Sequence, residues 1–298
     1  MKKTISIILM LALSFASISA FAQEQNAEIA PAQDKQIFNH LSLGVNWGIL
    51  GRIGIDAAMP ITPHVNVRAG VSTMAAGIAA FTTGLGTIDG GDGATIDFKN
   101  LSATIPMSYH QNGMDIEKLK LDMKTGGLTS GELLFDIFPS KKKSFHFTVG
   151  AFFSSSPLVH ATGAALNAAG QSGIPQSDWA NTSIFGLTTD KQGNLVVDIE
   201  YGMKNVKPYI GIGFGRPVAL DRFVSFNFDM GVYVINGIHL YSYNYENETP
   251  SKIELNTPWY NQYPDLQEKL GKGQEYFDLL NGIPVLPYLR FNLFFRLF

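Results

Sequence analysis

The stretch LRFNLFFRLF, residues 289–298, decides the fold class of this chain because large apolar and polar side chains alternate along it. Successive residues of a β-strand point to opposite faces, so the pattern predicts a strand with one apolar and one polar face. The apolar face carries Leu289, Phe291, Leu293, Phe295 and Leu297, and the polar face carries Arg290, Asn292 and Arg296. Such a chain end needs an apolar medium on one side, whereas the tail of a water-soluble domain is usually polar.

The same two-residue alternation recurs through the chain and predicts eight antiparallel strands. They are expected at residues 39–49, 51–61, 64–75, 118–138, 144–157, 194–217, 222–243 and 285–298. Short turns near Thr62, Lys142 and Ala219 alternate with three long connections, and a reversal of parity near 204–208 indicates a β-bulge. One short helix is expected in the last long connection. This asymmetry of connections is typical of an all-β, antiparallel up-and-down transmembrane β-barrel, with short periplasmic turns and long extracellular loops.

The polar face is expected to point into the barrel, where positive and negative side chains neutralise one another in a narrow interior. The expected interior network consists of Arg52, Asp56, Arg68, Lys120, Asp122, Lys124, Glu132, Asp136, Asp229, Arg290 and Arg296. The apolar face then points outward to lipid over about ten residues per strand, the length that crosses a bilayer at a tilt. A soluble periplasmic β-protein with its apolar face inward is the alternative fold.

The N-terminus has the features of a secretory signal peptide, with two lysines, an apolar run and the small-residue pattern Ala20-Phe21-Ala22. We expect a signal peptide over 1–22, an N-terminal extension over 23–38 and one barrel domain over 39–298. The chain has no cysteine, which excludes disulfides, thiol catalysis and a lipidated N-terminal cysteine. A net charge of −3 gives no basic excess, so no nucleic-acid partner is expected.

Three segments near the C-terminus carry a resemblance to a known family. KPYIGIGFGRPV (207–218), FVSFNFDMGVYV (223–234) and IPVLPYLRFNLFFRLF (283–298) resemble the closing segments of small, eight-stranded outer-membrane β-barrel proteins of Gram-negative bacteria. The resemblance implies a location in the cell outer membrane, contact with lipid and lipopolysaccharide, and insertion by the barrel assembly machinery, which would read Phe298. Many such proteins have no assigned activity. Arg296 departs from the usual pattern, which has an aromatic residue two before the end.

The sequence contains no motif for catalysis, for a cofactor or for a metal. Its histidines lack metal-ligand or triad spacing, and neither H-E-x-x-H nor G-x-S-x-G is present. We therefore expect a non-enzymatic barrel, without catalytic, cofactor or metal residues, that has a structural or surface-interaction role. A small porin or channel is the first alternative. A barrel enzyme that remodels lipid A is the second, and His160, which follows Ser154, Ser155 and Ser156, is at a suitable height for it.

Two aromatic runs are candidates for stacking on the sugars of an external glycan. They contain Tyr241, Tyr243, Tyr245, Trp259, Tyr260 and Tyr263. We interpret these runs as an interfacial aromatic girdle together with packing inside the loops, because both positions favour aromatic rings with a polar tip. The sequence does not identify a surface ligand.

Overall fold

The structure is a computed structural model in which part of the chain is described. The described residues are 40–49, 52–74, 87–91, 94–97, 101–110, 113–180, 183–184, 186–218, 221–246, 249–264, 267 and 273–297. The expected signal peptide and N-terminal extension, and the expected assembly residue Phe298, lie outside them. Among the described residues, no helix has the length and apolar character needed to cross a bilayer.

Eight antiparallel strands close into a barrel, in the spatial order β1-β18-β15-β14-β9-β8-β3-β2. They are β1 (Ser42–Gly48), β2 (Ile53–Thr62), β3 (Val65–Thr73), β8 (Thr129–Ile137), β9 (His146–Ser154), β14 (Val206–Gly215), β15 (Val224–Val234) and β18 (Val285–Arg296). The first and last strands pair, with Val45 opposite Leu293, and this pairing closes the barrel. The predicted antiparallel eight-stranded barrel is confirmed, because each predicted segment contains one of these strands.

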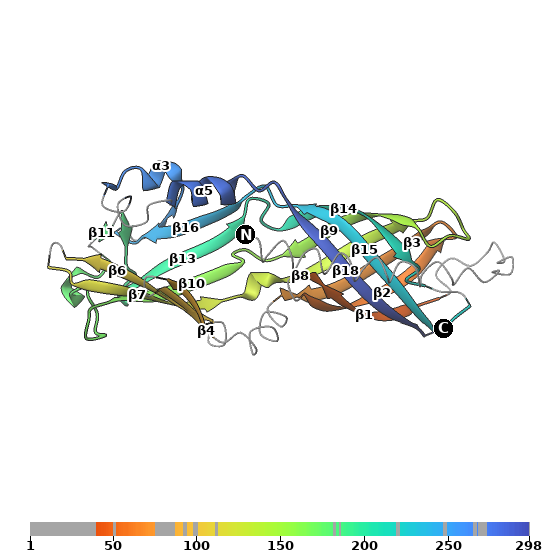
Figure 1. Ribbon diagram of the computed structural model, residues 1–298, viewed down its shortest axis with the longest axis horizontal. Helices are drawn as coiled ribbons and strands as arrows, with labels where there is room; N and C mark the ends of the chain where they lie inside the picture. Colours follow the sequence, from red (N-terminus) through yellow and green to blue (C-terminus); the bar gives the residue numbers. More distant parts are fainter. Residues whose placement is uncertain are drawn as a thin grey trace.

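A second sheet of eight strands extends beyond one end of the barrel, opposite the short turns (Figure 1). Its strands are β4 (Thr87–Gly91), β5 (Ala94–Asp97), β6 (Ser102–Tyr109), β7 (Ile116–Lys124), β10 (Val159–Leu166), β13 (Asn194–Tyr201), β16 (Ile238–Asn244) and β17 (Ser251–Glu254). Four of them, in the order β16-β13-β10-β7, follow the order of the barrel strands β15-β14-β9-β8. The second sheet therefore continues one half of the barrel wall.

The extent of three predicted strands is wrong, because each is divided between the barrel and the second sheet. Segment 118–138 breaks at a 3-10 turn over Gly126–Leu128, and segment 194–217 breaks between Tyr201 and Val206 where a bulge was predicted. Segment 222–243 breaks at Asn236 and Gly237, whose positive φ angles of 56° and 94° turn the chain in a way that few residue types allow. The alternation of side chains keeps its parity across the first and third breaks, so it does not reveal them, whereas the reversal of parity near 204–208 lies at the second break.

Two helices cover part of the second sheet, beside β16 (Figure 1). They are α3 (Thr257–Tyr260) and α5 (Gly273–Asn281). Asn256 caps α3 by accepting a hydrogen bond from the Trp259 N–H at 3.0 Å, and Pro258 lies in its first turn. One helix is expected in the last long connection, and its described part holds two, with α5 packed on α3 through the rings of Tyr260 and Phe277.

The barrel carries its apolar side chains outward and its ionic side chains inward. The outward rings of Trp47 and Phe226 are 68% and 69% exposed, whereas the inward Arg68, Asp136 and Arg290 are completely buried. This is the reverse of a soluble barrel, so the alternative with the apolar face inward is not the observed fold. A closed barrel has no unpaired strand edge and presents an apolar band, which are the two requirements for spanning lipid.

Candidate functional site in the barrel interior

The centre of the barrel holds a cluster of buried ionic side chains, which we call the ionic layer. It consists of Asp56, Arg68, Glu132, Asp136, His146, Asp229 and Arg290. Alternation places all of them on the inward face of their strands, because each has the parity opposite to the outward apolar residues.

Arg68 forms the first ion pair that crosses the lumen. Its Nη1 lies 2.7 Å from Asp229 Oδ2, and its Nη2 lies 2.7 Å from Asp136 Oδ1. Asp136 stands on β8, which is adjacent to the Arg68 strand β3, but Asp229 stands on β15. Strands β3 and β15 are four positions apart in either direction around the barrel. The Arg68–Asp229 pair therefore joins opposite walls.

Arg290 forms the second crossing pair. Its Nη1 contacts Glu132 Oε1, and strands β18 and β8 are again four positions apart in either direction. The same guanidinium lies 3.6 Å from Asp56 Oδ2 and 3.5 Å from Asp229 Oδ2. Two pairs, on different pairs of opposite strands, thus fill the cross-section of the lumen with charged groups.

Asp229 is the hub of the ionic layer. His146 Nε2 lies 3.1 Å from its Oδ1, and the Asn292 amide donates to its Oδ2 at 3.1 Å. The side-chain amide oxygen of Asn227, Oδ1, accepts hydrogen bonds from both Arg68 Nη1 at 3.1 Å and the Asn292 amide at 2.7 Å. Because every member is withdrawn from water, the loss of one charge leaves its partner uncompensated, which typically costs about 3–5 kcal/mol.

An aromatic layer closes the mouth of the barrel that faces the second sheet. It consists of Phe152, Tyr209, Tyr233 and Tyr288, all buried, from four neighbouring strands. Ring centroids are separated by 5.1 Å for Phe152–Tyr288 and by 5.6 Å for Tyr209–Tyr288, in edge-to-face contact. A Cβ atom at Gly211 or Gly231 would collide with the Tyr209 hydroxyl, so glycine at these inner-wall positions makes room for the layer.

The structure places the sequence-predicted interior residues in three locations. Seven of them line the barrel lumen or its mouth, namely Arg52, Asp56, Arg68, Glu132, Asp136, Asp229 and Arg290. Arg296 is the last residue of β18, half-buried at the rim with the short turns and opposite Ser42. The placement of Lys120, Asp122 and Lys124 in the interior is wrong: they are exposed on β7 of the second sheet, because the strand ends at Lys124 and a new one begins at Thr129.

None of the six sequence-predicted loop aromatics lies in a barrel strand. Tyr241 and Tyr243 lie on β16, with Tyr245 just after it, and the other three (Trp259, Tyr260 and Tyr263) lie in α3 or directly behind it. Tyr243 packs on Tyr245 and Trp259 packs on Tyr263, with centroid separations of 6.1 and 5.7 Å, and Tyr241 stacks on His239. Trp259 and Tyr260 also pack on Phe277. Packing within the second sheet and its helices therefore accounts for their positions.

The second sheet holds a buried carboxylate that sequence reasoning missed. Asp198 on β13 lies 2.6 Å from His160 Nδ1 on β10 and accepts a hydrogen bond from the Tyr243 hydroxyl at 2.5 Å. Burial, followed by this bond to Asp198, raises the pKa of Tyr243 above its ordinary value. The group is assembled by cross-strand register, with His160 directly opposite Asp198, so no spacing in the linear sequence indicates it.

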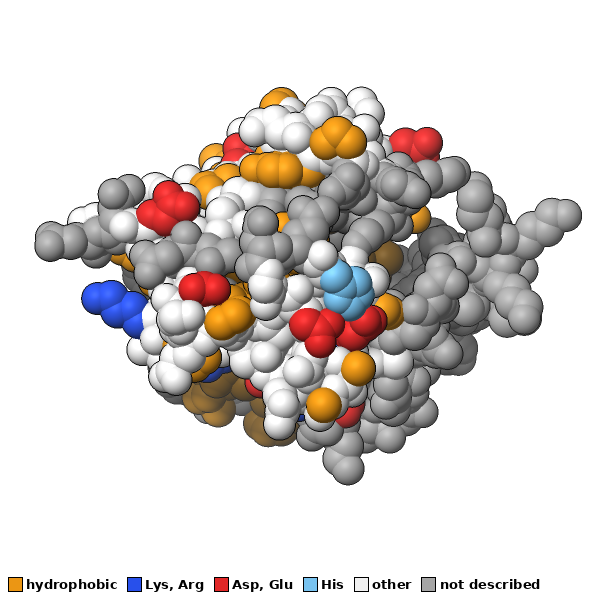
Figure 2. Space-filling view, turned by 90° about the vertical axis from the view of Figure 1, so that its left-hand side faces the viewer, with side chains coloured by type: hydrophobic (Ala, Val, Ile, Leu, Met, Phe, Trp, Pro, Cys, Tyr) orange, Lys and Arg blue, Asp and Glu red, His pale blue; other side chains and the backbone are white. Residues whose placement is uncertain are grey.

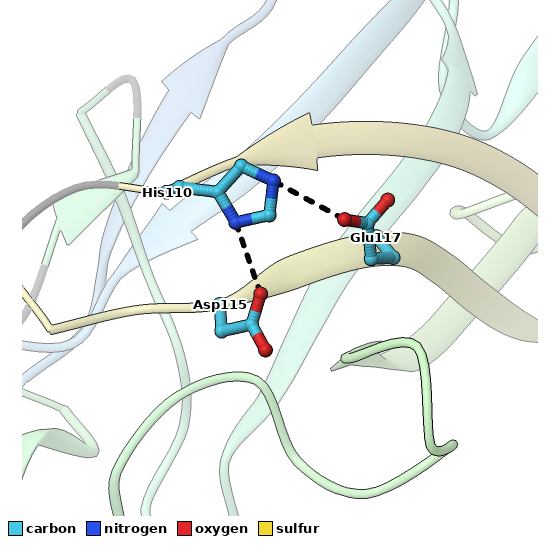
Figure 3. A group of neighbouring side chains, drawn as sticks. All are labelled: His110, Asp115 and Glu117. Atoms are coloured by element: carbon cyan, nitrogen blue, oxygen red, sulfur yellow. Dashed lines mark hydrogen bonds and ion pairs between the residues drawn. The ribbon is translucent and has the colours of Figure 1, made fainter.

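A third group lies at the far end of the second sheet, where acidic side chains gather around a histidine (Figure 2). His110 Nδ1 lies 2.9 Å from Asp115, and Nε2 lies 3.1 Å from Glu117 (Figure 3). One ligand atom from each residue lies within 4.8 Å of the others, which is close enough for one divalent cation. All three side chains are at least 40% exposed, and both ring nitrogens already face a carboxylate, so the group acts as a solvated ion-pair cluster.

The comparisons with known proteins leave function to be argued from this chain. No family model matches the sequence, and no match is found among curated proteins. The crystal structures of CarO2 and CarO from Acinetobacter baumannii each cover 88% of this chain, at 13% and 14% identity with TM-scores of 0.40 and 0.35. The likeness extends over 100% and 99% of those chains, respectively. This chain is, by its own geometry, an all-β protein with a closed eight-stranded antiparallel barrel.

Proposed function

We propose that this protein is an integral outer-membrane protein whose barrel anchors the second sheet outside the cell and does not conduct ions or solutes. The observation that supports this proposal most strongly is the pair of ion pairs, Arg68–Asp229 and Arg290–Glu132, that cross the lumen between opposite strands. The lumen of an eight-stranded barrel is only wide enough to be filled by side chains. Crossing pairs at its centre leave no continuous path for water.

The aromatic layer provides a second barrier at a different depth. Phe152, Tyr209, Tyr233 and Tyr288 meet across the mouth and pack against Leu134 and Ile235 in one hydrophobic cluster. An ion that entered the lumen would have to displace these rings before it reached the ionic layer. Two barriers, one apolar and one charged, thus close the lumen at two depths, as expected for a barrel that serves as an anchor.

The second sheet then carries the interaction role. Four of its strands continue the barrel wall away from the short turns, and α3 and α5 lie beside it (Figure 1). In this proposal the barrel contacts lipid and lipopolysaccharide, Phe298 serves the barrel assembly machinery, and the protein has no catalytic role. The partner of the second sheet is a surface ligand.

Planar-bilayer recording tests the closed barrel. We expect the wild-type protein to give no unitary conductance steps, since both barriers are intact. A variant with both crossing pairs removed, Arg68→Met with Arg290→Met and Glu132→Gln, should admit water and give a small or noisy conductance. Stable single-channel steps from the wild-type protein would contradict the proposal and favour the channel alternative.

The location and the absence of lipid chemistry need separate measurements. Membrane fractionation should place the protein with outer-membrane markers, and unheated samples should migrate differently from heated ones on a denaturing gel because the closed barrel resists unfolding. Mass spectrometry of lipid A should show the same acyl pattern with and without the protein. A changed acyl pattern would show enzymatic activity and contradict the anchor role.

A further inference from the structure

Two buried cations at the mouth of the barrel have no carboxylate partner. Arg52, in the hairpin before β2, is 7% exposed, and Lys207, at the start of β14, is 2% exposed. Arg52 Nη1 donates to the Ser72 hydroxyl at 3.2 Å, and Lys207 Nζ donates to the Ser154 hydroxyl at 2.5 Å and to the Lys204 carbonyl at 2.9 Å. No aspartate or glutamate within the described part of the chain forms an ion pair with either.

This arrangement differs from that of the other buried arginines. Arg68 and Arg290 each have carboxylates from two or more strands within ion-pair distance. Arg52 has instead the rings of Phe152 and Tyr288, at 5.2 and 5.5 Å, and Lys207 has the ring of Tyr201 at 5.4 Å. Aromatic rings compensate a desolvated cation only in part, because withdrawing a charge from water carries a larger penalty than the contact with a ring returns.

Both cations line the same cavity, at the junction of the barrel and the second sheet. Ser130, Ser154, Tyr201 and Tyr233 line it as well, and it has room for about one water-sized group. The Ser130 hydroxyl is buried and has no hydrogen-bond partner. The cavity thus offers two positive charges and a spare hydroxyl donor, and it offers no negative charge.

We propose that this cavity binds a small monovalent anion of chloride size between the Arg52 guanidinium and the Lys207 ammonium group, with the Ser130 hydroxyl as a further donor. A neutral water molecule in this place would leave both charges uncompensated. The bound anion links the β1–β2 hairpin to β8 and β14 above the aromatic layer. This site does not depend on whether the barrel conducts.

Chloride NMR line widths test the site in the full-length protein in detergent micelles. Chloride that exchanges with a protein site gives a broadened line. We expect the wild-type protein to broaden the line in excess of free chloride and in a saturable way. Gluconate is too bulky to compete for the site, so adding it should leave this excess broadening unchanged. Lys207→Met and Arg52→Met should each abolish the excess. The control is Arg216→Met, at the opposite mouth, where the guanidinium already donates to the carbonyls of Ser140, Lys141 and Lys143. This control should retain the excess.

Loss of the excess in both cavity variants but not in the control supports the site, provided that the variants keep the heat-dependent gel shift of a folded barrel. Equal broadening in wild-type and Lys207→Met would overturn it. If a cavity variant does not fold, the wild-type titration decides, because saturable broadening that bromide displaces supports the site and purely linear broadening contradicts it.

Discussion

The barrel interior and the second sheet both bury carboxylates, but they compensate them differently. In the barrel, Asp229 and Glu132 meet fully buried arginines from the opposite wall. In the second sheet, Asp198 and Glu200 are also buried, but their partners His160 and Lys252 come from the same sheet and remain 37% and 30% exposed. In these barrel pairs the counter-charge comes from across the lumen and is buried, whereas in the second sheet it comes from a neighbouring strand or the next but one and is partly exposed to solvent.

This difference predicts that breaking an ion pair inside the barrel destabilises the protein more than a change in the second sheet does. Arg290→Met leaves Glu132 and Asp56 as uncompensated buried carboxylates, so the free energy of unfolding should fall by about 3–5 kcal/mol. Urea unfolding of the protein in lipid vesicles measures it. Adding Glu132→Gln to Arg290→Met should restore part of the loss, because the pair is then removed together.

The matched control for this prediction lies on the second sheet. Lys124→Met removes an exposed positive charge on β7 and should change the free energy of unfolding by less than about 0.5 kcal/mol. If Arg290→Met lowers the free energy of unfolding no more than Lys124→Met does, the crossing pairs do not stabilise the barrel. The described difference between the two regions is then wrong.

A smaller effect is expected for the buried carboxylate of the second sheet. Tyr243→Phe removes the hydroxyl that donates to Asp198 and leaves that carboxylate with His160, at a cost of about 1–3 kcal/mol. Amide hydrogen exchange should show faster opening of β13 and β16 with the barrel strands unchanged. Tyr245→Phe serves as the control, since the contact of Tyr245 with Thr188 is made by its backbone N–H. Equal opening in both variants would argue against the Asp198 bond.

The smallest effect is a pH dependence confined to the second sheet. Burial acts to raise the pKa of Glu200, but hydrogen bonds from Lys252 and Ser156 together with the charges of Lys252 and Lys204 outweigh it and hold the pKa below its ordinary value of 4.5. A depressed pKa contributes stability that is present above pH 4.5 and is lost as the pH falls through the folded value. Hydrogen exchange of β13 should therefore accelerate in acid, and Glu200→Gln should reduce this dependence. An unchanged acid response in Glu200→Gln would locate the sensitivity elsewhere.

The sequence predicts the barrel well because its signal is periodic and local. Leu289 to Leu297 alternate with Arg290 and Asn292, and this parity alone places Arg290 in the lumen, where the structure has it. The crossing partner Glu132 cannot be predicted in the same way, because it depends on which strands lie opposite after closure. The aromatic layer has a weak signal, namely large rings such as Tyr209 and Tyr233 at inward positions.

The second sheet cannot be predicted from the alternation of side chains. Alternation continues from β8 into β7 and from β15 into β16, so parity does not mark the point where the chain leaves the barrel. Strand β10 lies in a segment of small residues, VHATGAAL, whose apolar and polar faces hardly differ. The parity that β7 shares with β8 predicts Lys120, Asp122 and Lys124 in the lumen, although they lie beyond it.

The most direct test compares the lipid exposure of these two regions in a chain that has no native cysteine. A fluorophore on Phe226→Cys, an outward barrel position, should be quenched by a quencher on lipid acyl chains and protected from aqueous iodide. A fluorophore on Lys120→Cys, exposed on the second sheet, should show the opposite behaviour. If the label at 226 is quenched by iodide as strongly as the label at 120 and ignores the lipid quencher, the outward apolar face is not in lipid, and the account of the barrel as a membrane anchor is contradicted.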